Sequence, residues 1–395
     1  MSLLTDAEGE PLPFDGPTEL VPGSELRQAG SHTALLRSGA RTLFVKKATQ
    51  EMVAKKEWND RRRVLLYIRN ELRFYAEFAE DLRSRGVDVP LSHHLAGVNL
   101  DGLEAHDDEP EVDFCGGVML LQALEPSRYF QTSPLTPAQT KRVLDAAARL
   151  HGAAWEDAPL LERAAARLVR HGGSGALTAR NPKELQELPA SWDRFAAAFA
   201  SEAPPGFFAR PEIARLGVRL HAAAVYISAQ LSPAPADPFA TLVHGDLKAM
   251  NVFLPRGDTE GDRAVLIDFA STGVGNAMTD VVLHLVHALT PADLDGGGEE
   301  ALVDYYLEAL ATRRGGGAAP YPREAALRHY RLAVCDYGRF VMGRFWRDAT
   351  PASFAANAAK PNVVLANRNL ASALRFVERI SECLAAVEVE MAASN

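Results

Sequence analysis

Three oxygen-bearing side chains, those of Asp246, Asn251 and Asp268, lie between apolar runs that are typical of short strands. Asn251 directly precedes the run Val252–Leu254, which leads into a turn, and Asp268 ends the next apolar run. A turn between two such runs predicts a β-hairpin, in which the start of one arm lies beside the end of the other. We therefore expect the three side chains to meet at one rim of the hairpin.

Oxygen ligands of this kind suit Mg²⁺, which keeps several waters and is bound by one or two carboxylates beside phosphate groups. Phosphoryl transfer from ATP needs such an ion and a group that positions the attacking hydroxyl. In that chemistry Asp268 is the main metal ligand, Asn251 is the second, and Asp246 orients the acceptor hydroxyl and receives its proton. A single Asp or Asn more often caps a turn, but the combined pattern H-G-D-x-x-x-x-N followed by apolar-D-F favours the chemistry.

The same residues resemble those of a known superfamily. His244–Asp246 with Asn251 resembles the catalytic loop of the aminoglycoside phosphotransferase and choline-kinase-like small-molecule kinases, and Ile267–Phe269 resembles their metal-binding segment. HGD stands where protein kinases have HRD, and Ala270 replaces the glycine of DFG. Asp280 resembles the aspartate that braces the catalytic loop of these kinases. The D-F-x-x-T-G-x-G continuation looks closest to the ecdysteroid-kinase-like and choline-kinase-like branch.

The resemblance implies an α+β, protein-kinase-like fold of two lobes: a small antiparallel β-sheet N-lobe and a larger, mainly helical C-lobe. Residues 1–22 are predicted to be a loose lead-in, 23–124 the nucleotide-binding N-lobe, and 125–395 the C-lobe with the catalytic loop and acceptor pocket. The polar connector Gln122–Pro126 is the predicted hinge, where backbone groups near Gln122 and Leu124 would bind adenine.

A β-type run, Leu43–Lys46, ends in a lysine, which places an ammonium group where it could contact the α- and β-phosphates. Lys47 competes with Lys46, but neighbouring strand residues point to opposite faces, so only one of them can face the nucleotide. The superfamily pattern favours Lys46. Glu71 stands in a segment like the superfamily's E-x-x-F-Y helix, and the resemblance implies that Glu71 pairs with Lys46.

Other elements follow from periodicity and turn signals. Strands are predicted over 25–36 and 40–47, and the turn Gln28–Thr33 either lies over the nucleotide phosphates or is a plain hairpin turn. Helices are predicted over 51–85, 136–155, 299–313, 323–346 and 363–389, with glycine loops at 296–298 and 315–317. His151 is expected to be a packed structural histidine. The aromatic residues of 337–346 are expected in the core, or alternatively along an acceptor pocket.

The composition limits the classes of protein to which the chain could belong. The chain has 395 residues and a net charge of −9, which argues against non-specific binding to nucleic acid or to an anionic membrane. An acidic run, Asp101–Asp113, reads as a solvated loop. Three widely spaced cysteines suit reduced thiols, and neither a secretory signal nor an apolar run of about 20 residues is present, so a cytoplasmic location is expected.

The leading hypothesis is an ATP- and Mg²⁺-dependent kinase that phosphorylates a hydroxyl of a small molecule. The alternative is a catalytically inactive, kinase-like nucleotide-binding scaffold, which the single glycine of the 28–33 turn would favour. A protein kinase is disfavoured because HRD, DFG and A-P-E segments are missing. Fold alone does not define the acceptor, and neither the acceptor nor the oligomeric state follows from the sequence.

Overall fold

The computed structural model describes residues 3–5, 11–14, 16–27, 30–103, 115–257, 261–313 and 321–394. Gln28 and Ala29 of the predicted turn, most of the acidic run, and the glycines at 315–317 lie outside the described residues. Among the described helices, none combines the length and the apolar character that a membrane crossing requires.

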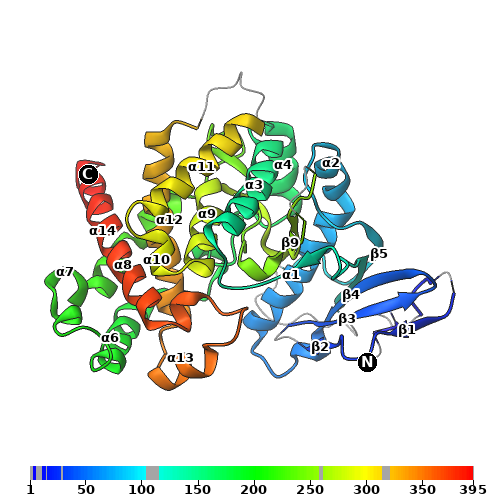
Figure 1. Ribbon diagram of the computed structural model, residues 1–395, viewed down its shortest axis with the longest axis horizontal. Helices are drawn as coiled ribbons and strands as arrows, with labels where there is room; N and C mark the ends of the chain where they lie inside the picture. Colours follow the sequence, from blue (N-terminus) through cyan, green and yellow to red (C-terminus); the bar gives the residue numbers. More distant parts are fainter. Residues whose placement is uncertain are drawn as a thin grey trace.

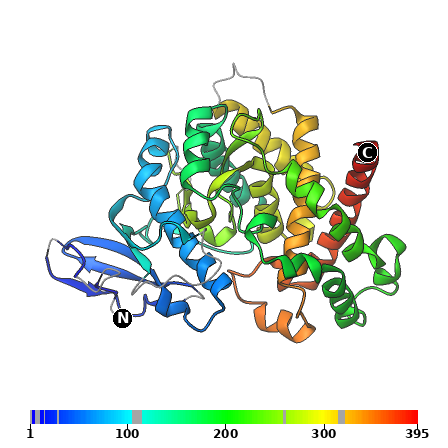
Figure 2. The same cartoon turned by 180° about the vertical axis from the view of Figure 1, so that it is seen from behind.

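A six-stranded antiparallel sheet forms one end of the molecule (Figures 1 and 2). Its main path runs β1–β3–β4–β6–β5, and β2 pairs with β3. The strands are β1 (Thr18–Leu20), β2 (Leu26–Arg27), β3 (His32–Ser38), β4 (Arg41–Thr49), β5 (Ser92–Val98) and β6 (Gly116–Gln122). Alternating apolar residues of β3, β4 and β6 form a core on one face, which includes Leu36, Val45 and Leu120.

The predicted strand region 25–36 contains two paired strands: β2 ends before the predicted turn Gln28–Thr33, and β3 begins at His32. One sequence expectation is corrected. The predicted lead-in is not loose where it is described, because β1 pairs with β3 and because Leu3 and Leu12 are buried against the sheet core. Leu3 and Leu12 thus cover apolar surface that β3 and β4 would otherwise expose.

The helical segment after β4 has three parts in place of the single helix predicted over 51–85. A 3₁₀ turn (Gln50–Val53) is followed by α1 (Trp58–Glu77) and α2 (Ala79–Ser84). The break falls at Phe78, whose backbone leaves helical geometry while its side chain is fully buried. Helix α1 packs on β5 and β6, which places one of its faces against the sheet and another toward the C-terminal half.

The C-terminal half is mainly helical. It opens with α3 (Pro137–Ala154), which Thr136 and Gln139 start with a reciprocal capping box. The remaining helices are α4 (Ala158–Arg167), α5 (Pro182–Gln186), α6 (Leu188–Phe199), α7 (Pro211–Ala214), α8 (Leu216–Gln230), α9 (Ala277–Ala288), α10 (Pro291–Leu294), α11 (Gly298–Arg313), α12 (Arg323–Arg344), α13 (Pro351–Asn357) and α14 (Leu370–Ser394). Helix α12 is central, since it packs on α6, α8, α9 and α14.

Short strands carry the central segment between these helices. β9 (Val252–Pro255) and β10 (Val265–Leu266) form the predicted hairpin, and β7 (Tyr129–Phe130) pairs with β9. β8 (Ala240–Val243) pairs with β11 (Gly273–Asn276). The Ile267 N–H donates to the Asn251 carbonyl over 3.0 Å, which brings the start of one hairpin arm beside the end of the other. The expected α+β architecture of a sheet lobe and a helical lobe is confirmed.

Candidate active site

One ammonium group joins the two lobes. Lys46, on β4, lies with Nζ 2.6 Å from Glu71 Oε2 on α1 and 2.8 Å from Asp268 Oδ1 after β10. The expected pair of Lys46 with Glu71 is therefore present, and Asp268 adds a second carboxylate to it. The Glu71 side chain is buried, that of Lys46 is 14% exposed, and that of Asp268 is 29% exposed.

Lys47 points the opposite way, as strand alternation predicts. Its side chain is fully buried, and its Nζ donates to the backbone carbonyl of Thr5 over 2.9 Å and to the Thr5 hydroxyl. Lys47 thus ties the N-terminal segment to the sheet, and Lys46 is the lysine that faces the other lobe.

The backbone at Asp268 is left-handed, with φ of 66°, a conformation that Asp adopts more readily than most residues. Burial raises the pKa of its carboxyl, but Lys46 and Lys248 outweigh burial and hold that pKa below its usual value. Asp268 is therefore an anion at neutral pH. Burial raises the pKa of Glu71, and Lys46 only partly offsets this effect.

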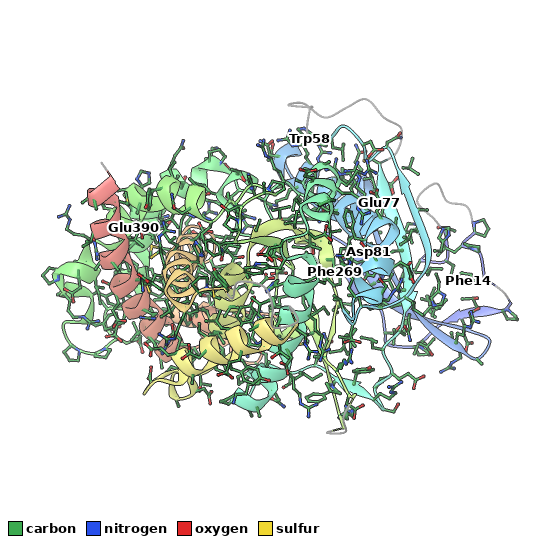
Figure 3. The ribbon with its side chains drawn as sticks, turned by 90° about the horizontal axis from the view of Figure 1, so that it is seen from above. Phe14, Trp58, Glu77, Asp81, Phe269 and Glu390 are labelled. Carbon is green, nitrogen blue, oxygen red and sulfur yellow. The ribbon has the colours of Figure 1, made fainter. Side chains whose placement is uncertain are left out.

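The turn after Asp268 is fixed to helix α1. The Phe269 ring stacks on the Phe74 ring with centroids 3.8 Å apart. The Asn70 carboxamide donates to the backbone carbonyls of Phe269, Ala270 and Thr272 over 2.9–3.2 Å. Phe269 lies where the sheet lobe meets the helical lobe (Figure 3). These contacts orient Asp268 relative to Glu71, because Phe74 and Asn70 belong to the same helix as Glu71.

The loop His244–Asp246 is held by a buried carboxylate on α9. Asp280 accepts hydrogen bonds from the backbone N–H of His244 over 2.7 Å and from that of Gly245 over 2.9 Å. The Asp280 carboxylate also forms a hydrogen bond with His151 Nε2 over 3.1 Å. The Tyr306 hydroxyl forms a hydrogen bond with Nδ1, the other ring nitrogen of that histidine. His151 is thus buried and hydrogen-bonded, as expected, and Asp280 contacts the loop in the way that the resemblance implied.

Asp246 lies at the end of this loop with its side chain 26% exposed. The Asn251 Nδ2 donates to the Asp246 carbonyl over 2.8 Å and to Asp246 Oδ2 over 3.1 Å. Because its N–H groups face Asp246, the carbonyl oxygen of the Asn251 side chain is the end that could bind a cation. Within the described ranges there is no group of three or more His, Cys, Asp or Glu side chains that could hold a metal ion.

Lys248 was missed by the sequence reasoning. Its Nζ lies 3.1 Å from Asp246 Oδ2, and this carboxylate raises the pKa of the lysine. The only indication in the sequence was that Lys248 stands two residues after Asp246. That position alone does not distinguish it from an ordinary exposed lysine. Asn70 was also missed, since it stands beside Glu71 and its role depends on a turn about 200 residues away.

The predicted hinge residues lie apart from this cluster. Gln122 and Leu124 line a cavity of about 460 Å³ together with Asp88, Arg128 and Arg263. The Gln122 N–H donates to the Leu91 carbonyl, and the Ala123 N–H donates to the Thr42 carbonyl. No hydrogen bond engages the backbone of Leu124 within the described residues. Lys46 pairs across the sheet with Met119, three residues before Gln122.

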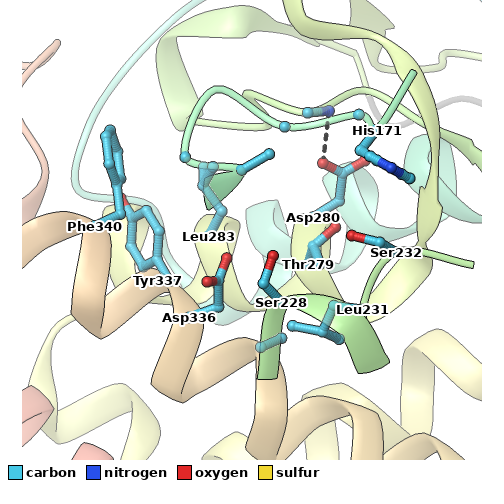
Figure 4. Close-up of a pocket in the computed structure, with 16 residues that line it drawn as sticks. His171, Ser228, Leu231, Ser232, Thr279, Asp280, Leu283, Asp336, Tyr337 and Phe340 are labelled. Carbon is cyan, nitrogen blue, oxygen red and sulfur yellow. Dashed lines mark hydrogen bonds between the residues drawn. The ribbon is translucent and has the colours of Figure 1, made fainter. Parts of the chain in front are cut away.

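A pocket of about 380 Å³ opens beside Asp246 and Lys248. Tyr337, Phe340 and Phe345 line it, so part of the 337–346 aromatic group lines a pocket, whereas Trp346 is core. A smaller cavity adjoins it, because both include Leu283, Tyr337 and Phe340. In Figure 4 the Ser228, Thr279 and Asp336 side chains of this smaller cavity come from α8, α9 and α12.

Comparisons with solved structures find chains of similar fold. The amicoumacin kinase hAmiN, in complex with AMP-PNP, Ca²⁺ and Ami, is 9% identical with a TM-score of 0.50, over 92% of this chain and 90% of that one. A microcompartment-associated aminopropanol kinase is 14% identical with a TM-score of 0.45, over 96% and 95%. Choline kinase LicA from Streptococcus pneumoniae is 10% identical with a TM-score of 0.41, over 94% and 93%.

A comparison with curated protein sequences gives no significant match. The profile of the phosphotransferase enzyme family, APH, matches residues 32–321, which is well over half of the chain and includes Lys46, Glu71, Asp246 and Asp268. The superfamily that the HGD and IDF segments resembled is therefore confirmed. The chain belongs to the phosphotransferase enzyme family and is similar to small-molecule kinases.

Proposed function

We propose that this protein transfers the γ-phosphoryl group of ATP to a hydroxyl of a small molecule. The observation that carries the proposal is the position of Lys46, which contacts Glu71 and Asp268 from two lobes through one ammonium group. Because two carboxylates contact its ammonium group, the Lys46 side chain has a fixed direction. A fixed ammonium group suits the binding of an anion such as phosphate. The geometry supports a role for Lys46 at the nucleotide phosphates, with Glu71 fixing its direction.

The residues present suit a magnesium ion. Asp268 is anionic, partly exposed and held in place by its left-handed turn, and the carboxamide of Asn251 has its oxygen end available. Bound Mg²⁺ would neutralise charge that develops on the phosphoryl oxygens. Because carboxylate and amide oxygens are the ligands that this ion prefers, we assign Asp268 and Asn251 as its protein ligands.

Asp246 is proposed as the residue that orients the acceptor hydroxyl. It lies at the pocket between Lys248 and Asn251, and both of these side chains contact its Oδ2. One carboxylate oxygen is thus fixed by two donors, which leaves Oδ1 to accept a hydrogen bond from a hydroxyl. A hydroxyl has a pKa far above that of a carboxylate, so its proton moves late, as the new P–O bond forms and the bond to ADP breaks.

Replacing Asp246 tests the assignment. Asp246→Asn should lower kcat by roughly 10² to 10⁴ and leave the KM for ATP nearly unchanged, because its carboxylate acts on the acceptor. Transfer of labelled γ-phosphate is measured over a panel of sugars, amino alcohols, polyols and sterols. Asp193→Asn, at an exposed position on α6, is the control. Phosphorylation by Asp246→Asn at the wild-type rate would refute the role of Asp246.

For the hinge, we propose that the backbone of Leu124 binds the adenine ring, with Gln122 at the edge of that site. This follows from the lack of a described hydrogen bond at the Leu124 backbone, since a backbone donor and acceptor without partners in the chain can pair with a planar heterocycle. Leu124→Pro removes the N–H donor and should raise the KM for ATP, while Leu124→Ala should change it little.

A further inference from the structure

The pocket beside Asp246 also carries information about the acceptor. We infer that the acceptor is an uncharged alcohol with a largely apolar body, which binds against the aromatic wall of α12 and α13. This inference rests on the proposed function, because it treats the pocket at Asp246 as the acceptor site. Three observations lead to it: the apolar wall, the pairing of the two charged lining residues with each other, and the neutral polar groups of the lining.

The wall of the pocket is built from aromatic and branched side chains. Tyr337 and Phe340 come from α12, Phe345 follows that helix, Phe354 lies on α13, and Val363 and Val364 come from the next segment. Phe345 is 45% exposed and packs edge-to-face on Phe340 with centroids 5.3 Å apart. An exposed aromatic ring at a pocket is apolar surface that a ligand can cover, and its burial favours binding.

The charges on the pocket lining already balance. Asp246 and Lys248 are the charged lining residues among those described, and they pair with each other. His287 also lines the pocket, but burial lowers its pKa to about 3, so its ring is neutral. Because Lys248 already balances the charge of Asp246, an ammonium group brought into the pocket would lose water without gaining an unpaired carboxylate.

Three charged groups near the pocket also have partners. In the adjoining cavity Asp336 forms an ion pair with Arg339 over 2.9 Å, and Asp280 accepts hydrogen bonds from two backbone N–H groups. Arg180 lies over the Phe340 ring but is held by Glu184, so it does not offer a free cation to an acidic acceptor. Two cations lie next to lining residues without being part of the lining: Lys360 donates to the Asn357 carboxamide over 2.9 Å, and Arg368 donates to the Ala358 carbonyl and the Ser133 hydroxyl. The charged groups that line the pocket itself therefore favour neither a cationic nor an anionic acceptor.

The remaining polar groups of the pocket are neutral. Asn362 and Asn367 add carboxamides, and Ser174 adds a hydroxyl. The Ser353 hydroxyl is used in the cap of α13 with Thr350, and the Asn357 side-chain oxygen accepts from Lys360. Carboxamides and hydroxyls can pair with hydroxyl or carbonyl groups of a ligand without a net charge on either side. An acceptor that carries a second hydroxyl on an apolar scaffold therefore matches both the wall and its polar positions.

A matched series of acceptors tests the inference. The compounds share one apolar ring scaffold and one primary alcohol, and the second substituent is a hydroxymethyl, a protonated aminomethyl or a carboxylate. With the full-length protein and Mg-ATP, kcat/KM should be at least tenfold higher for the hydroxymethyl compound than for either charged analogue. Equal or better use of a charged analogue would overturn the inference.

Binding without turnover separates this inference from the proposed function. Thermal stabilisation of the nucleotide-free protein by the three compounds should follow the same order, even if phosphate transfer is not observed. If the hydroxymethyl compound binds best but no variant or condition gives transfer, the proposed function fails and the acceptor class stands. If the protein turns over Mg-ATP but the hydroxymethyl compound neither binds nor reacts, the acceptor class is wrong.

A charge placed on the wall provides a second test. Phe345→Glu should lower kcat/KM for the hydroxymethyl compound and raise it for the aminomethyl compound, shifting their ratio at least tenfold. Phe345 is half-exposed, so the substitution should leave the fold intact. Val389→Glu, at an exposed apolar position on α14, is the control and should leave the ratio unchanged. An unchanged ratio in Phe345→Glu would show that this wall does not contact the acceptor.

Discussion

Lys46 is one cation shared by two carboxylates, and this imbalance shapes the chemistry of single residues in the site. Its contacts to Glu71 and Asp268 are 2.6 and 2.8 Å. Burial lowers the pKa of the ammonium, but these two carboxylates outweigh burial and raise it overall. Lys46 is therefore charged at any physiological pH. A nucleotide phosphate would compete with Asp268 for this ammonium and leave Asp268 to a metal ion.

Replacing Lys46 should remove nucleotide binding more than it removes the fold. Lys46→Met is expected to lower kcat/KM for ATP by roughly 10², because one charged contact to the developing phosphoryl charge is lost. The two carboxylates then lose the cation that contacts them both, so the free energy of unfolding should also fall by about 3 kcal/mol. Steady-state kinetics and urea unfolding measure the two effects.

Lys47→Met is the matched control for Lys46→Met. Lys47 binds the N-terminal segment at Thr5, on the opposite face of β4. Its replacement should cost stability while leaving kcat/KM for the remaining folded protein unchanged. Similar losses of catalytic efficiency in the two variants would contradict the assignment of Lys46.

At the scale of elements, the loop His244–Asp246 depends on a glycine that no other residue can replace without strain. Gly245 has φ of 81°, and a Cβ there would lie 2.2 Å from the Ser271 carbonyl oxygen. The close approach lets Asp280 receive both backbone N–H groups of the loop. The position of Asp246 therefore depends on the packing of this loop against the turn after Asp268.

Two glycine substitutions separate backbone strain from steric overlap. Gly245→Ala combines a left-handed backbone, which costs about 1–2 kcal/mol, with an overlap that the neighbouring backbone cannot relieve. Gly39→Ala has φ of 58° but no atom within 4 Å of its Cβ, so only the backbone cost applies. Urea unfolding should show a larger loss for Gly245→Ala by at least about 2 kcal/mol. Equal losses would mean that the loop relaxes freely.

Helix α9 should make the fold sensitive to acid. Burial lowers the pKa of His284 to about 4 and that of His287 to about 3. Because the unfolded chain binds protons near pH 6.5, it takes up more protons than the folded chain below that value. The free energy of unfolding should therefore fall from pH 6.5 toward pH 4, with a loss of about 2 kcal/mol per histidine at pH 5.

His284→Asn isolates this contribution. The variant keeps a side-chain N–H for the Leu247 carbonyl, which His284 Nδ1 contacts over 3.1 Å, but it cannot titrate. Its unfolding free energy should change less between pH 7 and pH 5 than that of the wild type. His221→Asn, at an exposed position on α8, should keep the wild-type pH dependence. A wild-type slope in His284→Asn would assign the acid sensitivity to other groups.

At the scale of the whole molecule, the lobe architecture and the site depended on different kinds of sequence information. The hairpin that carries Asn251 and Asp268 was predictable because its apolar runs and turn are local. The Lys46–Glu71 pair was predictable for two reasons. Strand alternation places Lys46 and Lys47 on opposite faces, and the superfamily resemblance favours Lys46 and identifies the helix that carries Glu71. The lobe boundary near Gln122–Pro126 stays a prediction.

The remaining features depend on contacts between distant segments. The pairing of Thr18–Leu20 with β3 was not predicted, because the Pro- and Gly-rich composition of this segment indicated a loose chain. Such a composition is nevertheless compatible with a short edge strand. The break at Phe78 reflects burial of that ring, which overrides helix propensity. Phe345, Phe354 and Val363 belong to different segments of the chain. They form one wall because of the way in which α12, α13 and α14 pack, which the sequence alone does not show.

Because Lys46 belongs to the sheet lobe and Asp268 to the helical lobe, a ligand bound by both should stabilise the entire fold. Binding to the native state adds RT ln(1 + [L]/Kd), which is about 2.7 kcal/mol at a hundredfold excess over Kd. This link between the two lobes makes thermal stability a direct test of the proposed nucleotide site, independent of the acceptor.

The most direct test of the account is the thermal stability of wild type and Asp268→Ala with and without Mg-ATP. Each protein is compared with its own nucleotide-free baseline, with EDTA plus ATP as the metal-free condition. The account predicts a Mg²⁺-dependent rise in Tm for wild type that is lost in Asp268→Ala. No shift in wild type, or an equal shift in the variant, would contradict the magnesium–nucleotide site at Lys46 and Asp268.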